Sequence, residues 1–329
     1  YKENLVTFHR GNWVEHLDPE HNTIMDNRGQ AFRFGKLLLA TGGIPQVFHL
    51  PGGNLKEIFY FRTLDDYQLL RERATPGKTA VVIGGGFIGS EMAAALCISQ
   101  LKVTMLYNSP FLCSRVFPES LGREMEKVYG EKGIRIVKGV TPTSFEQTGE
   151  GIVIKTNQDP IEADLVVAGI GIKPNVGLAE SAGLKTNDGI LVNSLLQTSH
   201  PDIFAAGDNT RFPCPSLGRD IRLEHWDNAL KQGKQAGKNM AGASEAYSQL
   251  PYFFSDLFKF GYEAVGDIDP RLETFADWQK ENHTGVIYYL LDGKLRGALM
   301  CNVWDKVEKA KELILQGAGP ANTLAGAIR

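Results

Sequence analysis

Three glycines at a fixed spacing are the residues of this chain whose chemistry is easiest to infer. In the run TAVVIGGGFIGSE (79–91) an apolar strand leads into Gly84, Gly86 and Gly89, and an alanine-rich helix follows. In a G-x-G-x-x-G turn the first glycine permits a tight turn, the second lets backbone approach a pyrophosphate, and the third lets helix pack on sheet. The N–H groups at the helix start then face the phosphates. The run therefore predicts a dinucleotide site.

The residue that would select between the two nicotinamide coenzymes is neutral here. A second strand, 102–106, is followed by Tyr107, where an NAD site usually has an acid for the ribose hydroxyls and an NADP site has an arginine nearby. Arg115 lies some way on. Both coenzymes stay open, with a preference for NADH because no cation is placed for a 2′-phosphate, unless Arg115 reaches in.

Two further segments indicate a second dinucleotide. LLLATGG (37–43) is an apolar strand that ends in a small-residue turn, and TSHPDIFAAGD (198–208) delivers Asp208 to a glycine turn. Each alone could be an ordinary strand-to-loop transition with a capping acid. Their order, one on either side of the glycine-rich run, favours a second nucleotide site.

With these motifs the chain resembles the FAD-dependent pyridine nucleotide-disulfide oxidoreductases, in the branch of apoptosis-inducing factor and the ferredoxin and rubredoxin reductases. Besides the glycine run, the resemblance rests on FRTLDD (61–66), GIKPN (171–175), EHWDNA (224–229) and FFSD (253–256), and it covers essentially all 329 residues. It implies an FAD domain that is interrupted by an NAD(P)H domain and closed by a C-terminal interface domain. The cofactors implied are FAD and NAD, with NADP as the other option.

On the FAD side, the resemblance implies a role for residues from three segments. Arg62 would contact the phosphate region of FAD, and Asp208 would accept a hydrogen bond from a ribityl hydroxyl. Thr41 and Gly42 would contact the FAD backbone-side surface.

On the nicotinamide side, Phe87 would stack near the ring, and Glu91 would lie by its carboxamide and the flavin N5 edge. Gly171 would offer backbone to the same pocket. Glu224 and His225 would border both rings.

Some of these roles have a plain structural alternative. Glu91 could be a solvated first-turn acid favoured by the helix dipole, and His225 could be an interior histidine with satisfied hydrogen bonds. Phe254 stands where relatives often have a tryptophan beside the isoalloxazine, but it and Phe253 could be ordinary core residues. The predicted cofactor-binding residues are Val14, Ala40, Thr41, Gly42, Arg62, Gly85, Gly86, Phe87, Ile88, Gly89, Glu91, Tyr107, Gly171, Asp208, Glu224, His225, Trp226 and Phe254.

The family has two features before the segment that begins here at Tyr1, and the chain as written contains neither. They are the glycine motif for the ADP part of FAD and a lysine that pairs with the motif glutamate. We therefore expect part of the FAD domain to be absent from the chain as written, and FAD to be held poorly by it.

Composition argues against two classes of partner. The chain has 35 basic and 38 acidic residues, a net charge of −3, without the basic excess of a nucleic-acid binder. Its apolar runs are shorter than the ~18–20 residues of a membrane span. We expect no nucleic-acid partner and no membrane span.

The four cysteines, Cys97, Cys113, Cys214 and Cys301, lie far apart without a C-x-x-C pair. This spacing indicates neither a disulfide framework nor a structural zinc site, and no metal is predicted. It also argues against an enzyme of the thioredoxin-reductase type. Thiols in a reducing compartment predict a cytoplasmic location, although a targeting segment before Tyr1 would not be visible.

The elements that must position these residues fall into three parts. Residues 1–75 are β-rich, with one strand predicted at 32–40, and end in a helix, 64–74. From Lys78 strands and helices alternate, which is typical of a parallel, doubly wound sheet. The last part has a hairpin around Asp292-Gly293 and a terminal helix over 303–316.

The predicted fold class is α/β, with doubly wound nucleotide-binding domains and a C-terminal α+β interface domain. The predicted domains are a partial FAD domain (1–76), an NAD(P)-binding domain (77–198), the return segment of the FAD domain (199–249) and the C-terminal domain (250–329).

The resemblance implies an enzyme that passes hydride from NAD(P)H to FAD and electrons on to a ferredoxin, a rubredoxin or a quinone. No catalytic side chain is expected, because the cofactors carry the chemistry. One alternative is a redox-sensing or assembly protein like apoptosis-inducing factor, with slow turnover, and another is a non-functional fragment. A homodimer is a further hypothesis.

Overall fold

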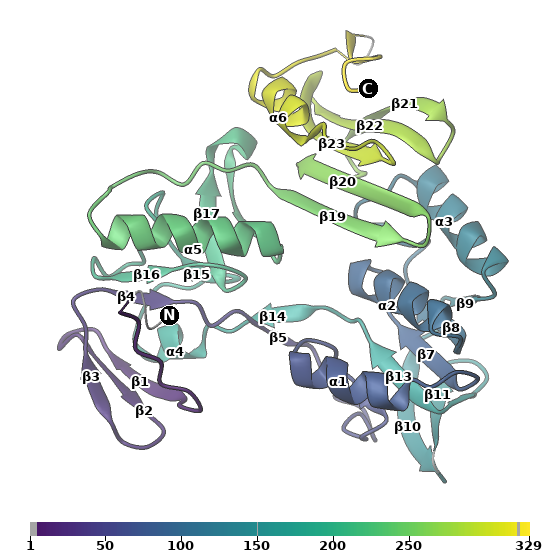
Figure 1. Cartoon of the computed structure of the whole chain (residues 1–329), viewed down its shortest axis with the longest axis horizontal. Helices are drawn as coiled ribbons and strands as arrows, with labels where there is room; N and C mark the ends of the chain where they lie inside the picture. Colours follow the sequence, from purple (N-terminus) through teal and green to yellow (C-terminus); the bar gives the residue numbers. More distant parts are fainter. Residues whose placement is uncertain (1–4, 150, 321–322) are drawn as a thin grey trace. The chain divides into compact units, whose positions relative to one another are not determined.

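The computed structural model shows a mixed α/β chain that forms two compact units (Figure 1). One unit consists of residues 1–43 and 174–249, and the other of residues 44–173 and 250–329. The predicted fold class is confirmed. Of the domain boundaries predicted from the sequence, the one between residues 249 and 250 coincides with a boundary between the two units, and the other two lie at other residues. The predicted division into domains stays a prediction. The residues that the structure describes are 5–149, 151–320 and 323–329.

A five-stranded parallel sheet forms the centre of the second unit (Figure 1). In sheet order its strands are β6 (Ile58–Phe59), β13 (Leu165–Ala168), β7 (Thr79–Ile83), β8 (Lys102–Tyr107) and β9 (Arg135–Lys138). The central strands are buried apolar runs, as is usual for parallel strands covered on both faces. Helices α2 (Phe87–Ile98) and α3 (Glu119–Glu131) connect strands and pack on the sheet. The predicted alternation from Lys78 onward is confirmed.

Two smaller elements complete this part of the unit. Helix α1 (Leu64–Arg73) begins at a capping box, in which Thr63 Oγ1 accepts from the N–H of Asp66 at 3.1 Å and the Asp66 carboxylate accepts from the N–H of Thr63 at 2.7 Å. An antiparallel three-stranded sheet lies in the chain between β9 and β13. Its strands are β10 (Pro142–Thr148), β11 (Gly151–Thr156) and β12 (Ile161–Ala163).

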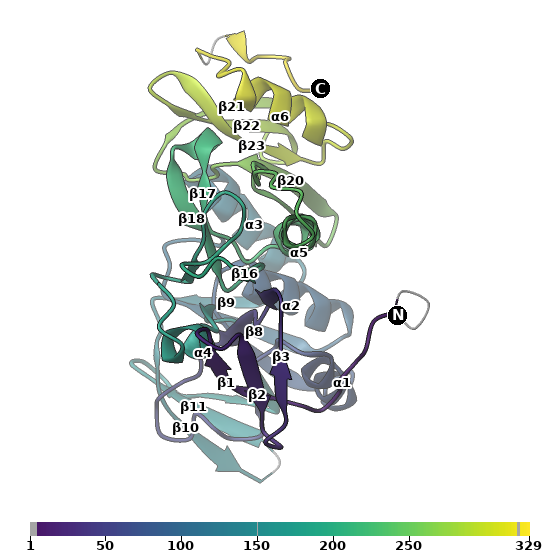
Figure 2. The same ribbon diagram turned by 90° about the vertical axis from the view of Figure 1, so that its left-hand side faces the viewer.

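The C-terminal part of the second unit is an antiparallel five-stranded sheet with helix α6 (Val307–Leu315) packed across β20 and β23 (Figure 2). In sheet order the strands are β19 (Tyr252–Leu257), β20 (Phe260–Gly266), β23 (Lys294–Cys301), β22 (Thr284–Leu291) and β21 (Glu273–Lys280). The predicted hairpin is confirmed, since Asp292 and Gly293 join β22 to β23 with φ of +53° and +70°. The predicted helix start at 303 is wrong, because Asp305 has a φ of +60° that a helix excludes.

In the first unit, β4 (Leu37–Leu39) pairs in parallel with β16 (Ile203–Ala205). The single strand predicted at 32–40 is wrong, because the chain bends at Gly35 and Lys36 and residues before the bend belong to another sheet. The other elements of this unit are β1 (Val14–Asp18), β2 (Thr23–Asp26), β3 (Ala31–Arg33), α4 (Gly177–Ser181), β15 (Ile190–Leu191), β17 (Thr210–Cys214), η2 (Pro215–Leu217) and β18 (Arg219–Arg222). The chain passes from one unit to the other within two short strands, β5 (Gly43–Pro45) and β14 (Ile172–Pro174).

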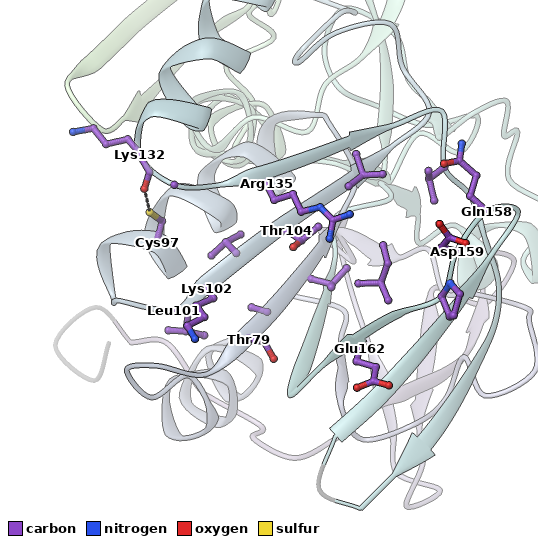
Figure 3. Close-up of a pocket in the computed structure, with 18 residues that line it drawn as sticks. Thr79, Cys97, Leu101, Lys102, Thr104, Lys132, Arg135, Gln158, Asp159 and Glu162 are labelled. Atoms are coloured by element: carbon purple, nitrogen blue, oxygen red, sulfur yellow. Dashed lines mark hydrogen bonds between the residues drawn. The ribbon is translucent and has the colours of Figure 1, made fainter.

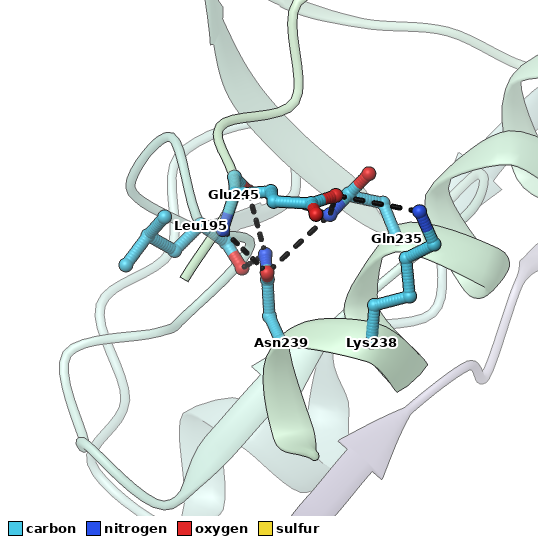
Figure 4. A network of polar contacts seen from close by, with 5 residues as sticks. All are labelled: Leu195, Gln235, Lys238, Asn239 and Glu245. Carbon is cyan, nitrogen blue, oxygen red and sulfur yellow. Dashed lines mark hydrogen bonds and ion pairs between the residues drawn. The ribbon is translucent and has the colours of Figure 1, made fainter. Parts of the chain in front are cut away.

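The long helix of the first unit, α5 (Trp226–Met240), packs on β16 and is seen nearly end-on in Figure 2. A polar network fixes the segment that follows it (Figure 4). The Asn239 amide donates to the carbonyls of Leu195 and Glu245, both at 2.9 Å, and accepts from the N–H of Glu245 at 2.9 Å. Two other side chains of the helix bind the Glu245 carboxylate. The chain beyond α5 is therefore tied to the last turn of that helix.

Candidate functional site

Two of the three motif glycines are required by the fold. Gly84 has a φ of +127°, and a Cβ there would lie 2.3 Å from the carbonyl oxygen of Gly169. A Cβ on Gly89 would lie 2.0 Å from the carbonyl oxygen of Gly84. The first and third glycines thus permit the turn and the close helix–sheet contact that the motif predicts.

Gly86 has no such structural reason. Its backbone is extended, with φ −90° and ψ −167°, and a Cβ there would have nothing within 4 Å. Gly86 is the N-cap of α2, and no side chain caps this helix end, so the first N–H groups of the helix are left for another acceptor. A small residue at an uncapped helix start fits an anionic group such as a pyrophosphate.

Tyr107 lies beside the glycine loop. A Cβ on Gly85 would be 2.8 Å from its ring, and its hydroxyl donates to Glu126 Oε1 at 2.7 Å. Burial and the nearby Glu126 raise the pKa of Tyr107. The second oxygen of Glu126 accepts from Lys138 Nζ at 2.9 Å. Helix α3 thus places a carboxylate next to Tyr107, the last residue of β8, although no local sequence pattern predicts it.

One face of α2 attaches to the C-terminal sheet. The Phe87 ring packs edge-on against Phe253 with centroids 5.0 Å apart, and one turn later Glu91 Oε1 accepts a short hydrogen bond from Ser255. Glu91 is therefore not a freely solvated acid, so that alternative is wrong. Ser255 was not among the predicted site residues.

Four further predicted cofactor-binding residues lie on the surface of this unit. Ile88 is exposed in the first turn of α2, and Phe254 is 54% exposed on the face of β19 opposite Phe253. The core alternative therefore holds for Phe253 and fails for Phe254. Gly171 is exposed with a φ of +98°, and its carbonyl accepts from the N–H of Gln46 at 2.9 Å. Arg62 is exposed at the start of α1.

In the first unit, the predicted A-T-G turn follows β4. Thr41 Oγ1 donates to the carbonyl of Asn175 at 2.6 Å, and the Gly42 carbonyl accepts from the N–H of Asn175 at 2.9 Å. The fully buried Asn209 donates to the carbonyl of Leu39 and to Thr41 Oγ1. Asn209, which the sequence did not single out, therefore joins this turn to the one after β16.

Asp208 follows β16 at the same edge of the parallel pair as Ala40, because both residues follow the carboxyl ends of their strands. Open α/β sheets bind ligands outside these ends. Asp208 is 8% exposed, and Gly207 before it has a φ of +91° and donates its N–H to Gln232 Oε1 at 2.8 Å. A buried acid at a glycine turn fits the hydroxyl of a polyol ligand.

Arg222 fixes this turn from the last residue of β18. Its guanidinium donates to the carbonyl of Asp208 at 3.2 Å, to Glu224 Oε1 at 2.8 Å and to Asp188 Oδ1 at 3.2 Å. The side chain is 12% exposed. Arg222 thus ties two predicted cofactor residues together, and sequence analysis missed it because Asp208 and Asp188 lie in other segments of the chain.

The remaining predicted residues of the first unit lie at the start of α5 and in β1. His225 is the N-cap of α5, and its burial lowers its pKa to about 4, while Asp208 and Asp227 act in the opposite direction. Trp226 is 72% exposed. Val14 begins β1, in a different sheet from β4 and β16, and its place in the site stays a prediction.

Comparison with known proteins assigns this arrangement to a family. Residues 1–233 match the pyridine nucleotide-disulphide oxidoreductases. The chain belongs to this family. Residues 236–284 match the C-terminal region of mitochondrion-associated apoptosis-inducing factor. The resemblance inferred from the motifs is confirmed.

Two curated relatives share about the same identity with the chain. It is 31% identical to the ferredoxin–NAD(+) reductase component of the anthranilate 1,2-dioxygenase system of Burkholderia cepacia, over 97% of this chain and 79% of the relative. It is also 31% identical to monodehydroascorbate reductase 3 of Arabidopsis thaliana, over 91% of this chain and 72% of the relative.

Two solved structures share the fold. The covalent putidaredoxin reductase–putidaredoxin complex gives a TM-score of 0.88 at 28% identity, over 95% of this chain and 77% of that one. The ferredoxin reductase for the CYP199A2 system of Rhodopseudomonas palustris gives a TM-score of 0.88 at 28% identity, over 95% of this chain and 78% of that one.

As a member of the pyridine nucleotide-disulphide oxidoreductases, the chain is an FAD-dependent NAD(P)H oxidoreductase, and both predicted cofactors are confirmed at this level. Two features described above agree with these cofactors. The open space at Gly86 fits a dinucleotide phosphate, and the buried Asp208 at the carboxyl ends of β4 and β16 fits FAD. The four cysteines are all free thiols, so none of them forms a disulfide here. Within the described ranges, no helix is both long and apolar enough to cross a membrane.

A cavity of about 490 Å³ in the second unit lies away from this chemistry (Figure 3). It opens where β7 and β8 begin, around Thr79 and Lys102, with Arg135 and Asp159 among the charged residues that line it. The glycine loop follows the opposite, carboxyl ends of the same strands. This cavity is therefore not the dinucleotide site.

Proposed function

We propose that the chain accepts hydride from NADH and passes electrons singly to a small iron–sulfur carrier protein of the ferredoxin class. The bound flavin would supply the two-electron to one-electron chemistry. The observation that carries the proposal is Gly86. The fold would admit a Cβ at this position, and the glycine instead leaves room for a phosphate at the uncapped start of α2. The relative with 31% identity that is a ferredoxin–NAD(+) reductase component supports the acceptor class.

The second unit would bind the coenzyme. The N–H groups at the start of α2 would hold the pyrophosphate, Phe87 would lie against the nicotinamide, and Glu91 would accept from its carboxamide. Among the described residues, Ser255 binds one oxygen of Glu91, and the other oxygen would accept from the ligand.

The first unit would bind the flavin. Asp208 would accept from a ribityl hydroxyl, and the backbone of Thr41 and Gly42 would line the same ligand. These turns are fixed before any ligand binds, by Asn209 and Arg222. A site fixed in advance loses less conformational entropy on binding.

The preference for NADH is supported by Glu126. Its carboxylate, bound to Tyr107, places a negative group near the glycine loop, and it occupies Lys138, the cation paired with it. Comparison of kcat/KM for the two coenzymes tests this. A preference for NADPH above about 100-fold, roughly 2.7 kcal/mol, would contradict it and implicate Arg115.

The acceptor is tested with the purified flavoprotein and NADH against three acceptors: a plant-type ferredoxin with cytochrome c as the final acceptor, a soluble quinone, and monodehydroascorbate radical. The last is included because several relatives are monodehydroascorbate reductases. Fastest turnover with ferredoxin is expected. Faster turnover with either small molecule would overturn the carrier-protein assignment and leave the oxidoreductase assignment intact.

A second function is favoured by the match of residues 236–284 to the C-terminal region of apoptosis-inducing factor. On this hypothesis the flavin state alters partner binding and turnover is slow. A long-lived reduced flavin–NAD charge-transfer band after mixing with NADH, together with slow turnover on all three acceptors, would support it.

Oligomeric state and compartment are the remaining parts of the proposal. A homodimer is proposed, to be tested by sedimentation equilibrium with FAD bound. The four free thiols support a reducing compartment such as the cytoplasm. Fractionation of the source cells would test this.

A further inference from the structure

We propose that Ser255 is a positioning residue for Glu91, through which the C-terminal sheet sets the rate of flavin reduction. The inference rests on the proposed function, in which Glu91 faces the nicotinamide. It assigns a role in the reaction to a residue of the C-terminal sheet that the sequence did not single out.

The first observation is a two-point attachment between α2 and β19. Phe87 and Glu91 are four residues apart and so lie on one face of the helix. Phe253 and Ser255 are two residues apart and so lie on one face of the strand. The two faces meet pairwise, ring against ring and hydroxyl to carboxylate. Both residues of α2 that are predicted to face the nicotinamide are thereby held by the C-terminal sheet.

The second observation is that Ser255 is itself fixed. It is 5% exposed, and it lies directly opposite Tyr262 in the antiparallel pairing of β19 with β20. Tyr262 is fully buried, and its ring packs edge-on against Phe117 at 5.3 Å and Phe253 at 6.2 Å. The hydroxyl that binds Glu91 therefore projects from a buried position of β19.

The chemistry follows from the donor and the acceptor. The hydroxyl of Ser255 donates to Glu91 Oε1, and a hydrogen bond to a charged acceptor is about twice as strong as a neutral one. Without it, a half-buried glutamate samples several rotamers and loses that freedom each time a ligand binds. With it, the second carboxylate oxygen has one direction, which pre-orients it for the carboxamide of the nicotinamide.

The test uses the full chain with FAD in saturating excess, because FAD is expected to be held poorly. Rapid mixing with NADH gives the limiting rate of flavin reduction and the half-saturating NADH concentration separately. Ser255→Ala is expected to lower the limiting rate about tenfold and to raise the half-saturating concentration less. Ser255→Thr keeps the hydroxyl and should restore the rate. Ser255→Cys keeps the size with a weaker donor and should fall between them.

The deciding measurement is a double-mutant cycle with Glu91→Gln. If Ser255 acts through Glu91, Ser255→Ala has no further effect in the Glu91→Gln background; additive effects would overturn the inference. NAD+ titrated into the oxidised enzyme gives a second readout, since the flavin difference spectrum should change in Ser255→Ala and recover in Ser255→Thr. An unchanged spectrum would also overturn it.

Two controls separate this inference from its premises. Thr274→Ala removes an exposed hydroxyl from β21 of the same sheet and should leave both readouts unchanged. If Ser255→Ala does not fold, as judged by its thermal melt, the Thr and Cys variants decide the question. If the unaltered flavoprotein is not reduced by NADH or NADPH, the proposed function fails; if it is reduced and the cycle is additive, only the role of Ser255 fails.

Discussion

At the scale of single residues, Gly84 and Gly86 stand two positions apart and are glycine for different reasons. Gly86→Val should abolish flavin reduction at low NADH concentration, because the branched side chain enters the space that the pyrophosphate needs. The fold should be kept, since nothing lies within 4 Å of a Cβ at Gly86. Rapid-mixing reduction kinetics and a thermal melt of the same preparation measure both. An unchanged rate at low NADH would mean that the coenzyme binds elsewhere.

The matched control is Gly84→Ala. Its Cβ would lie 2.3 Å from the carbonyl oxygen of Gly169, at a φ of +127°. This variant should lower the melting temperature by several degrees, because backbone must move to admit the methyl group. The two variants together separate loss of binding from loss of folding.

Arg222 carries a second prediction at this scale. Arg222→Gln should weaken FAD binding about tenfold, because the Asp208 carbonyl, Glu224 and Asp188 lose their shared donor. FAD fluorescence recovered on dilution measures the dissociation constant. Arg219→Gln, an exposed position on the same strand, is the control of equal charge and should leave FAD affinity within about twofold. Equal losses in both variants would indicate a general charge effect.

These residues also show how far the sequence predicts the site. Local patterns predict the glycine loop, the A-T-G turn at 40–42, and Asp208. In each case consecutive residues contain the signals for the strand and for the turn or helix that follows it. Local patterns do not predict the contact of Ser255 with Glu91 or those of Arg222 with Asp188 and Asp208, because these partners lie in other segments of the chain and only the folded topology brings them together. No local pattern distinguishes a serine that binds a glutamate of another element from a serine without such a contact.

At the scale of elements, the correct predictions are those with a strong local cause. The hairpin at Asp292-Gly293 needs two residues with positive φ, and the chain provides a pair that tolerates it. The strand predicted over 32–40 was apolar enough to be read as continuous, yet the bend at Gly35 divides it between two sheets. Pairing partners decide such breaks, and these are not encoded locally.

Asn239, at the end of α5, gives a prediction for an element. Asn239→Ala should lower the free energy of unfolding by about 1–3 kcal/mol, because it leaves the carbonyls of Leu195 and Glu245 without their donor. Lys238→Ala removes only an exposed ion pair and should cost under about 1 kcal/mol. Urea denaturation of both variants measures the difference. Equal costs would show that the network in Figure 4 does not hold the segment after α5.

At the scale of the whole molecule, each compact unit presents one set of groups that we propose to bind a nucleotide. The second offers the uncapped start of α2, and the first offers the turns after β4 and β16. The family match explains both sets, since its members use FAD and a nicotinamide coenzyme. Neither set of residues identifies the electron acceptor, because an electron carrier is recognised by surface charge and shape rather than by a fixed motif.

The stability of the whole molecule should depend on pH through His225. Burial lowers its pKa to about 4 from the usual 6.5, against the effect of Asp208 and Asp227. Between these two values the unfolded chain binds the proton and the folded chain does not, so stability is lost as pH falls from about 6.5 to 4. Above pH 6.5 the contribution of His225 to the free energy of unfolding is constant.

His225→Gln stays neutral in both states, so its stability should fall less steeply across this window, by up to about 1.4 kcal/mol per pH unit. Urea denaturation at several pH values compares the two proteins, and the carboxylates common to both cancel in the difference. Parallel slopes for the chain and His225→Gln would show that His225 takes up its proton equally in the folded and unfolded states.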